Sequence, residues 1–356
     1  MGSFSDKYNC VFGVDKLSNL HGKGTLEMAR AGRAYCEKQL ELMPDVIISI
    51  GGNSVADYKF QLKRAPKETE HWIVNQEGRV ADPFKRLTKV FEGNTVEFLT
   101  RMDHYGKCCA HDYCEHWERC TEQVVMPEFD YSNMYTVQKV MERMPADSIF
   151  NIANSTTIRI AQYFDLDESI QVYGNRGVNG IDGCVSAFIG QAAASPNKLN
   201  YLIVGDLTFF YDMNSIWNRY VGKNVRIMLN NNEGAALFHF NQGIQNYPTL
   251  NKNVAAEHFA TAKGWVEAQG FRYLSAHNKE EFDENLEYFI KENSDKPIFF
   301  EVFTHKDEDA KIQHEFYDKI ILKDTTKVVR NGVKKLIKSV LGEDILSKLK
   351  GVIGSQ

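Results

Sequence analysis

Oxygen-bearing residues follow two consecutive apolar runs in the second half of the chain. Gly205 and Asp206 come directly after the first run, and Asn231 follows the second. Because the carboxyl ends of neighbouring parallel strands meet at one edge of a sheet, we expect Asp206 and Asn231 to lie together. With a nearby backbone carbonyl, they would form an all-oxygen set of the kind that magnesium prefers. Such a site leaves coordination positions for phosphate oxygens and water.

The order Gly-Asp-Leu, helix, strand, Asn-Asn resembles the signature of thiamine-diphosphate-dependent enzymes, which binds magnesium and the cofactor's diphosphate. Two upstream segments are similar to the MenD-type family, the 2-succinyl-5-enolpyruvyl-6-hydroxy-3-cyclohexene-1-carboxylate synthases of menaquinone synthesis. Residues 154–159 read Asn-Ser-Thr-Thr-Ile-Arg, like the family's Asn-Ser-x-x-x-Arg. Residues 175–183 read Asn-Arg-Gly-Val-Asn-Gly-Ile-Asp-Gly, like its Asn-Arg-Gly-Ala-Ser-Gly-Ile-Asp-Gly. Residues 205–208 and 211–214 continue a resemblance that covers residues 15–322.

The resemblance implies a binding role for several residues and a 2-oxoacid decarboxylase or carboligase activity. The residues implied to contact substrate carboxylates are Ser155, Arg159 and Arg176. Those implied to contact thiamine diphosphate are Asn179, Gly180, Ile181, Asp182, Gly205, Asp206, Leu207, Asn231 and Leu237. Those implied to hold Mg²⁺ are Asp206, Asn231 and, through its carbonyl, Glu233. The cofactor would carry the difficult chemistry, and this chain would supply positioning and electrostatics.

Each implied role has a physical basis and an alternative. Gly180 and Gly183 would let the backbone approach the diphosphate where a helix begins, and helix N-termini favour anions. Arg159 and Arg176 would hold carboxylates through forked hydrogen bonds that lysine cannot copy. Either arginine could instead be a surface ion-pair residue. Ile181 resembles the family's apolar anchor, which keeps the cofactor folded, but it could equally be a core residue.

Three departures from the family's pattern bear on the substrate. Glu233 stands where the family often has glycine, Asn179 replaces serine, and the segment 235–238 is one residue longer than usual. A side chain at Glu233 requires a suitable backbone angle and adds a carboxylate near the site. These departures count against the menaquinone substrate, and the basic tail resembles tails on enzymes of bacterial surface-polysaccharide pathways. The sequence therefore leaves both pathways open, and it identifies neither the 2-oxoacid nor its acceptor.

The family's activating glutamate lies in a separate N-terminal domain, whereas this sequence resembles the family from its middle domain onward. We therefore expect no catalytic residue in this chain, with the activating glutamate supplied by a pyrimidine-binding-domain polypeptide. The expected assembly is a hetero-oligomer, a dimer of two such heterodimers. Two alternatives remain: a catalytically silent cofactor-binding or scaffold subunit, and a fragment of a full-length enzyme of the same family.

The elements that must position these residues follow an α/β pattern. We predict two three-layer parallel-sheet domains and a C-terminal amphipathic helix. The expected divisions are a middle, Rossmann-like domain at 1–104, a linker helix at 105–126, the diphosphate-binding domain at 127–322 and a basic tail at 323–356. Predicted strands are 45–50, 71–75, 88–92, 148–152, 199–204, 225–230 and 297–303, with a helix at 26–42. The Gly51-Gly52 turn lacks the full spaced-glycine pattern of a dinucleotide loop, so we read that domain as structural.

A cysteine-rich segment precedes the second domain. It contains Cys108, Cys109, Cys114 and Cys120, with His111 and His116 between them. The spacing fits no standard zinc finger, although a metal site remains an alternative. Tyr113, Trp117 and Cys120 recur at helical spacing, which favours a helix with one apolar face.

Composition limits the remaining classes of function. The chain has 356 residues and a net charge of -5, and seven cysteines indicate reduced thiols rather than a disulfide framework. An isoelectric point near 6.1 gives no basis for nucleic-acid binding. Neither a long apolar run nor a secretory signal is present, so we expect a cytoplasmic protein. The basic amphipathic stretch at 327–353 could contact a membrane, a partner or its own domain.

Overall fold

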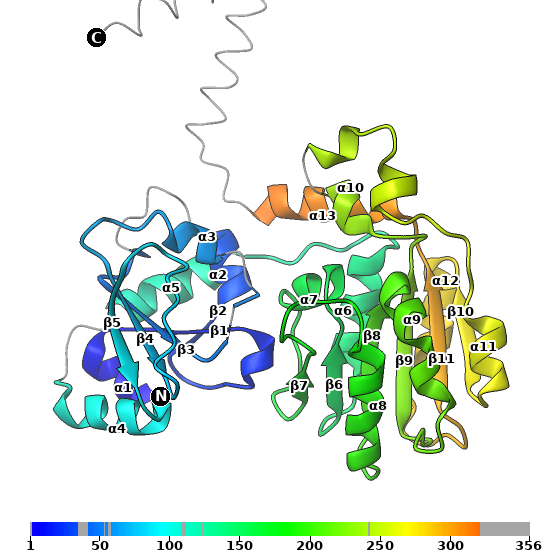
Figure 1. The fold of residues 1–356 in the computed structure, drawn as a ribbon, viewed down its shortest axis with the longest axis horizontal. Helices are drawn as coiled ribbons and strands as arrows, with labels where there is room; N and C mark the ends of the chain where they lie inside the picture. Colours follow the sequence, from blue (N-terminus) through cyan, green and yellow to red (C-terminus); the bar gives the residue numbers. More distant parts are fainter. Residues whose placement is uncertain are drawn as a thin grey trace, which may run out of the picture.

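The structure is a computed structural model that describes residues 2–34, 42–52, 54–55, 58–107, 112–122, 124–240 and 243–320. The predicted basic tail at 323–356 lies outside these ranges, as do Cys108, Cys109 and His111. Within the described part of the chain, no helix is long and apolar enough to cross a membrane. The predicted α/β class is confirmed, since a six-stranded and a three-stranded parallel sheet each belong to a separate unit (Figure 1).

The larger unit is built on the six-stranded parallel sheet. Its strands are β6 (Ile149–Ile152), β7 (Gln171–Tyr173), β8 (Asn200–Gly205), β9 (Val225–Asn231), β10 (Arg272–Ala276) and β11 (Ile298–Phe303). The spatial order is β10-β11-β9-β8-β6-β7. The chain therefore passes from β6 outward to β7 and then returns to the other side of β6 as β8. This reversal creates a switch point between β6 and β8, where open α/β sheets bind ligands.

Helices cover both faces of this sheet and form the predicted three layers. One face packs on α6 (Asn133–Arg143), α7 (Thr156–Ala161), α12 (Lys279–Phe289) and α13 (Lys306–Ile320). The other packs on α8 (Cys184–Ala194), α9 (Asp206–Asp212), the 3-10 helix η3 (Met213–Trp217) and α11 (Lys263–Ala268). Side chains alternate along each strand, so Ile203 faces the first set while Leu202 and Val204 face the second.

An irregular segment connects β9 to α11 beyond the carboxyl ends of the strands. It contains α10 (Ala236–Phe240), the 3-10 helix η4 (Ile244–Asn246) and the π-helix η5 (Leu250–Val254). In Figure 1, α10 lies beside α13 at the top of the sheet, and Phe240 stacks on His314 with ring centroids 4.2 Å apart. The segment is thus held over the edge where β8 and β9 end.

The smaller unit contains the three-stranded sheet, in the order β3-β4-β5. Its strands are β3 (Val46–Ile50), β4 (Glu70–Asn75) and β5 (Leu87–Glu92), and a separate parallel pair is formed by β1 (Phe12–Val14) and β2 (Thr25–Glu27). Its helices are α1 (Gly2–Tyr8), the 3-10 helix η1 (Lys16–Ser18), α2 (Met28–Ala34), α3 (Tyr58–Leu62), α4 (Thr95–Tyr105) and α5 (Asp112–Glu122). The helix predicted from Leu26 begins later, at Met28, because Leu26 pairs with Gly13 in the β1–β2 ladder.

The cysteine-rich segment forms the predicted helix, α5. Trp117 is fully buried and Cys120 nearly so, and the Trp117 ring meets Tyr58 edge-on with centroids 5.3 Å apart. Burial, helped by the charge of Glu118, raises the pKa of the Cys114 thiol to about 11, so this thiol stays protonated at neutral pH. Among the described residues, no group of three or more His, Cys, Asp or Glu is arranged to hold a metal ion.

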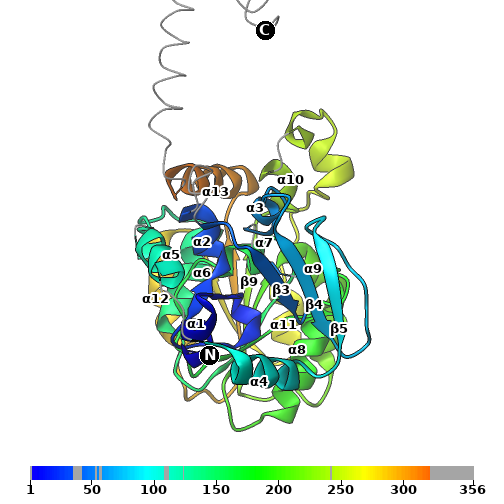
Figure 2. The same ribbon diagram turned by 90° about the vertical axis from the view of Figure 1, so that its left-hand side faces the viewer.

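The two units meet through hydrogen bonds, an ion pair and apolar packing, in which Ala29 and Val55 belong to the same core cluster as residues of the larger unit. Asn19 forms a reciprocal pair with Val172 of β7, with distances of 2.9 Å and 2.7 Å. Arg30 donates to the Tyr163 carbonyl and pairs with Asp165 at 2.7 Å. The smaller unit therefore lies against the β6–β7 side of the larger one, in front of it in Figure 2.

Candidate functional site

The ends of β8 and β9 bring Asp206 onto the asparagine loop. Gly205 pairs with Asn230 across the two strands, so the residues that follow them lie side by side. Asp206 is the first residue of α9, and its side chain is buried. Its Oδ2 accepts hydrogen bonds from the backbone N–H of Asn232 at 3.1 Å and of Gly234 at 2.9 Å. A carboxylate with two backbone donors on one oxygen is fixed in place before any cation arrives.

The orientation of Asn231 follows from the partners of its amide nitrogen. Nδ2 donates to the Ala260 carbonyl at 2.9 Å and to Oε1 of Glu301 at 2.8 Å. Glu301 is fully buried, and Tyr273 Oη also donates to it at 2.8 Å. With its nitrogen held there, Asn231 turns Oδ1 toward the loop, 3.5 Å from the backbone nitrogen of Glu233.

The third asparagine is held by a buried acid that the sequence did not indicate. Asn232 Nδ2 donates to Asp309 Oδ2 at 2.9 Å, and Thr304 Oγ1 donates to the same oxygen at 2.8 Å. The backbone N–H of Asn133 donates to Oδ1 at 2.8 Å. Burial raises the pKa of Asp309 to about 6, with the charge of Asp206 adding to the rise. Asp309 thereby connects α6 and α13 to the loop that contacts Asp206.

Glu233 adopts a left-handed backbone conformation, with φ of 66°. Its carbonyl accepts the backbone N–H of His258 at 3.3 Å, and its carboxylate turns away to Lys306, with Oε2 3.2 Å from Nζ. The carbonyl is therefore held toward the segment that contains His258, whose ring nitrogen Nε2 lies 3.3 Å from Asp206 Oδ2. The side-chain oxygens of Asp206 and Asn231, with this carbonyl, are the hard donors that a magnesium ion requires, so the residues present fit such an ion.

His258 is a residue that the sequence gave no means of finding. It lies in the irregular segment after η5, and its Nε2 is 3.3 Å from Oδ2 of Asp206. Its Nδ1 accepts the backbone N–H of Ala260 at 3.2 Å, whereas Nε2 is buried and has no hydrogen-bond partner among the described residues. Phe210 meets the ring edge-on at 5.3 Å.

Asn154 joins the two upstream motifs at the end of β6. Its Nδ2 donates to the carbonyls of Asn175 and Gly180, each at 2.6 Å. Its Oδ1 accepts a hydrogen bond from Arg176 at 3.0 Å. The side chain is almost completely buried. Asn154 was part of the quoted motif but had no assigned role, and the structure gives it one, because it fixes the path of the glycine-containing loop.

The two arginines face a common region. Burial lowers the pKa of Arg176, and the positive charge of Arg159 lowers it further, whereas Asp15 opposes the shift. Arg159 donates to the carbonyl of Ser155, a residue with φ of 75°. No ion pair to Arg159 or Arg176 is found among the described residues. Two guanidinium groups close enough to repel one another favour an anion between them.

The remaining predicted cofactor residues lie on the loop before α8 or on nearby helices. Asn179 is exposed with φ of 62°, and Gly183, with φ of 71°, caps α8. Ile181 and Leu237 are half-buried and belong to none of the described core clusters. Gly180, Asp182, Gly205 and Leu207 lie on the same edge of the sheet, before or at the first turns of α8 and α9. The structure thus leaves Ile181 available to a ligand rather than to the core.

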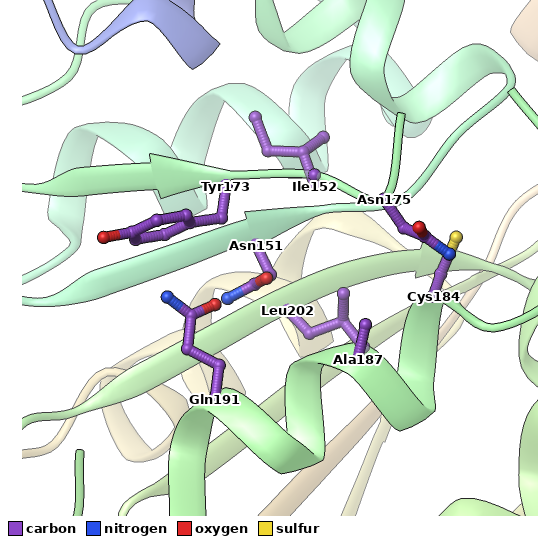
Figure 3. A pocket seen from close by; sticks show the side chains of 9 residues that line it. Asn151, Ile152, Tyr173, Asn175, Cys184, Ala187, Gln191 and Leu202 are labelled. Atoms are coloured by element: carbon purple, nitrogen blue, oxygen red, sulfur yellow. The ribbon is translucent and has the colours of Figure 1, made fainter. Parts of the chain in front are cut away.

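A cavity of about 220 Å³ opens beside this loop, between α8 and the β6–β7 side of the sheet (Figure 3). Asn175 and Cys184 line one end, and Asn151, Tyr173 and Gln191 line the other. Asn151 is buried, and its Nδ2 has no hydrogen-bond partner. The residues around Asp206 do not line this cavity, which was not predicted from the sequence.

Comparison with known proteins identifies the class of this domain. Residues 154–302 match the family model of the thiamine pyrophosphate enzyme C-terminal TPP binding domain. That range contains the switch point, the glycine loop and the Asp206–Asn231 edge. This part of the chain therefore matches a thiamine pyrophosphate binding domain, and the family resemblance predicted from the sequence is confirmed.

The relatives narrow the family further. The chain is similar to 2-succinyl-5-enolpyruvyl-6-hydroxy-3-cyclohexene-1-carboxylate synthase of Phocaeicola vulgatus, with 38% identity over 79% of this chain and 50% of the relative. The Bacteroides thetaiotaomicron synthase of the same name is 36% identical over 80% of this chain and 51% of its own length. The synthase of the same name from Flavobacterium johnsoniae is 32% identical over 79% of this chain and 51% of its own length. The chain thus spans about half the length of the curated relatives it matches.

Proposed function

We propose that this chain is the diphosphate-binding subunit of a thiamine-diphosphate- and magnesium-dependent 2-oxoacid decarboxylase or carboligase. The observation that carries the proposal is the contact between Asp206 and the loop Asn231–Gly234, at the ends of adjacent parallel strands. It occurs inside the segment that matches a thiamine pyrophosphate binding domain. The carboxylate of Asp206, the amide oxygen of Asn231 and the carbonyl of Glu233 are hard donors, and they would hold a magnesium ion at this edge of the sheet.

Two sets of residues would hold the diphosphate and its metal. Asp206, Asn231 and the Glu233 carbonyl would bind Mg²⁺. The loop from Asn179 to Gly183 would bring backbone N–H groups and the N-terminus of α8 toward phosphate oxygens. Bound thiamine diphosphate would supply the carbanion that attacks the keto carbon of a 2-oxoacid. The half-buried Ile181 would support the cofactor's folded shape.

Arg159 and Arg176 would bind the substrate's carboxylates, together with Ser155. Their mutual repulsion is relieved when an anion binds between them, which favours a doubly anchored carboxylate over a neutral ligand. Their contribution is to orient the 2-oxoacid before carbon dioxide leaves. If the enzyme is a carboligase, the positive charges of Arg159 and Arg176 would also select its acceptor.

A pyrimidine-binding domain would complete the site with the activating glutamate. In our proposal this domain is a separate polypeptide, and the assembly is a dimer of heterodimers. Coexpression with the polypeptide encoded directly upstream tests this part: copurification and decarboxylation of a 2-oxoacid support it. Copurification with cofactor binding but no turnover of any 2-oxoacid would favour a silent cofactor-binding subunit.

Removing the Asp206 carboxylate tests the site itself. We expect the unaltered chain to bind thiamine diphosphate with Mg²⁺ in calorimetry. Asp206→Ala should show no metal-dependent binding, because the metal loses its only side-chain anion in the proposed set. The exposed Asp295→Ala, whose partner is Arg272, serves as the control and should bind normally. Unchanged affinity in Asp206→Ala would refute the assignment.

A further inference from the structure

A buried lysine bridges the two chain segments that meet at the proposed metal loop. Lys306, the first residue of α13, has a side chain only 2% exposed. Its Nζ lies 3.2 Å from Glu233 Oε2 and 2.8 Å from Glu257 Oε1, whose side chains are 32% and 31% exposed. Burying an ammonium group is costly unless charged partners compensate for its lost hydration. The two carboxylates are therefore required by the burial of Lys306.

The ammonium group remains charged in this position. Its Nζ lies between two carboxylates, Glu257 at 2.8 Å and Glu233 at 3.2 Å, so the charge of the buried group is compensated on both sides. Without the lysine, these two carboxylates would face each other across the gap that its ammonium now fills. They would repel one another, and their segments would separate.

Backbone contacts show what such a separation would move. The Glu233 carbonyl accepts the His258 N–H at 3.3 Å, and the Ala235 N–H donates to the Ala255 carbonyl at 2.8 Å. A Cβ on Gly234 would lie 2.6 Å from that same Ala255 oxygen, so the two segments are in close contact. The side chain of Glu233 is thus the link between Lys306 and a carbonyl in the proposed metal set.

We propose that Lys306 is a positioning residue, which acts through Glu233 and Glu257 to fix the Glu233 carbonyl for metal binding. The inference rests on the proposed function, because it concerns the same magnesium site. It also explains why a side chain occurs at a left-handed position that glycine would occupy without strain. Glu233 accepts that strain in exchange for an ion pair with Lys306.

The test compares Lys306→Met in two backgrounds. Calorimetry of Mg²⁺ binding to the full chain, at saturating thiamine diphosphate, gives the apparent Kd for the metal. We expect Lys306→Met to raise this Kd about tenfold to a hundredfold, the range typical for residues that support metal ligands. In a Glu233→Gly background, the same substitution should change Kd by no more than about twofold, because the link to Lys306 is already gone.

A matched control separates this role from support of α13. Lys311 lies on the same helix and pairs with Glu308 at 3.5 Å, with a side chain 63% exposed. Lys311→Met should leave the Kd for Mg²⁺ unchanged. If Lys306→Met raised the Kd for Mg²⁺ by the same factor in both backgrounds, Lys306 would serve helix packing alone and the proposal would be overturned. An unchanged Kd in the single variant would overturn it as well.

Two milder substitutions keep the test decisive if Lys306→Met does not fold. Lys306→Arg retains the charge and should bind Mg²⁺ within about threefold of the unaltered chain, whereas Glu233→Gln should weaken binding at least as much as Lys306→Arg. The reverse order would contradict the role of Glu233 as the link.

If the unaltered chain fails to bind Mg²⁺ with thiamine diphosphate, the proposed function fails. If it binds and the variants match it, only the role of Lys306 fails.

Discussion

Arg176 combines two properties that seldom occur together in one side chain. It is partly buried, and it lies near a second guanidinium group, so its pKa is lowered from its usual value. The one hydrogen bond described for its side chain goes to Asn154 Oδ1, which leaves the rest of its planar group for a ligand. The fold therefore holds Arg176 by one edge, as a carboxylate receptor requires.

Substituting this arginine with lysine tests that role. In the assembled enzyme, Arg176→Lys should raise the KM for a 2-oxoacid roughly tenfold or more with a smaller change in kcat, because one forked charge-assisted contact is lost. Arg272→Lys, an exposed ion-pair residue, should leave KM unchanged. A loss confined to kcat would contradict a role in ground-state carboxylate binding.

Asp309 makes the stability of the protein depend on pH in an unusual direction. Its pKa is raised to about 6, whereas an unfolded aspartate ionises near 4. Between these values the folded state holds a proton that the unfolded state has released. The contribution of Asp309 to the free energy of unfolding therefore falls as pH rises from about 4 to about 6, by up to about 3 kcal/mol.

Denaturant unfolding at several pH values checks this sign. The difference in unfolding free energy between the unaltered chain and Asp309→Asn should change across pH 4 to 6 and be constant above it. Asn is the suitable replacement because it keeps the size of the side chain and one acceptor for the Asn133 N–H. A difference that is flat over the whole range would place the pKa of Asp309 near its ordinary value.

Sequence reasoning reached some of these residues and not others for a physical reason. Asp206 and Asn231 each end an apolar strand, and the pairing of parallel strands brings such ends together. His258 and Lys306 come from an irregular segment and from a helix start, and nothing in their local pattern indicates which strand end they approach. Tertiary packing alone decides those contacts.

At the level of single elements, α5 shows how one apolar face anchors a helix of polar composition. Trp117 is fully buried in a cluster with Tyr58 and Leu62 of α3 and Leu26 of β2. Among the described side chains of this helix, Cys120 is the one other that is buried. The indole ring therefore fills the largest part of the apolar contact that α5 makes, while Tyr113 adds a hydrogen bond to the Leu42 carbonyl at 3.0 Å.

Removal of the Trp117 ring should destabilise the folded protein. Trp117→Ala should lower the free energy of unfolding by about 3–5 kcal/mol, because it leaves a large cavity in the smaller unit's core. Trp217→Ala is the matched control: Trp217 is 67% exposed, and its loss should change stability by about 0.5 kcal/mol or less. Thermal or denaturant unfolding of both variants gives the comparison, and equal effects would contradict the packing argument.

Strands were predictable where a continuous apolar run marked them. β8, β9 and β11 are almost entirely buried, so their sequences carry the signal of a central parallel strand. β7 is three residues long with two exposed side chains, and β10 has only one buried residue. These two edge strands lack the apolar run, and the sequence analysis missed both.

For the whole molecule, the arrangement of the two units rests on contacts that have no sequence signature. The Asn19–Val172 and Arg30–Tyr163 contacts join a side chain to backbone, so almost any residue type could provide the backbone partner. The Arg30–Asp165 pair and the packing of Ala29 and Val55 add to this junction, but their local sequence does not indicate their partners. Asp15 connects this junction to the site: it accepts the Val55 N–H at 2.6 Å, and its charge acts on Arg176. The smaller unit therefore contributes to the electrostatics of the region around Arg176, where we propose that carboxylates bind, beyond the structural role expected of it.

The left-handed residues around the switch point have a consequence for engineering. Ser155, Asn179 and Glu233 all have positive φ, and each conformation costs a residue with a side chain of the order of 1 kcal/mol or more. Selection for heat resistance would draw these positions toward glycine, whereas selection for turnover would keep the hydroxyl, amide and carboxylate groups. Libraries screened for thermal tolerance alone should thus accumulate glycine at these three codons.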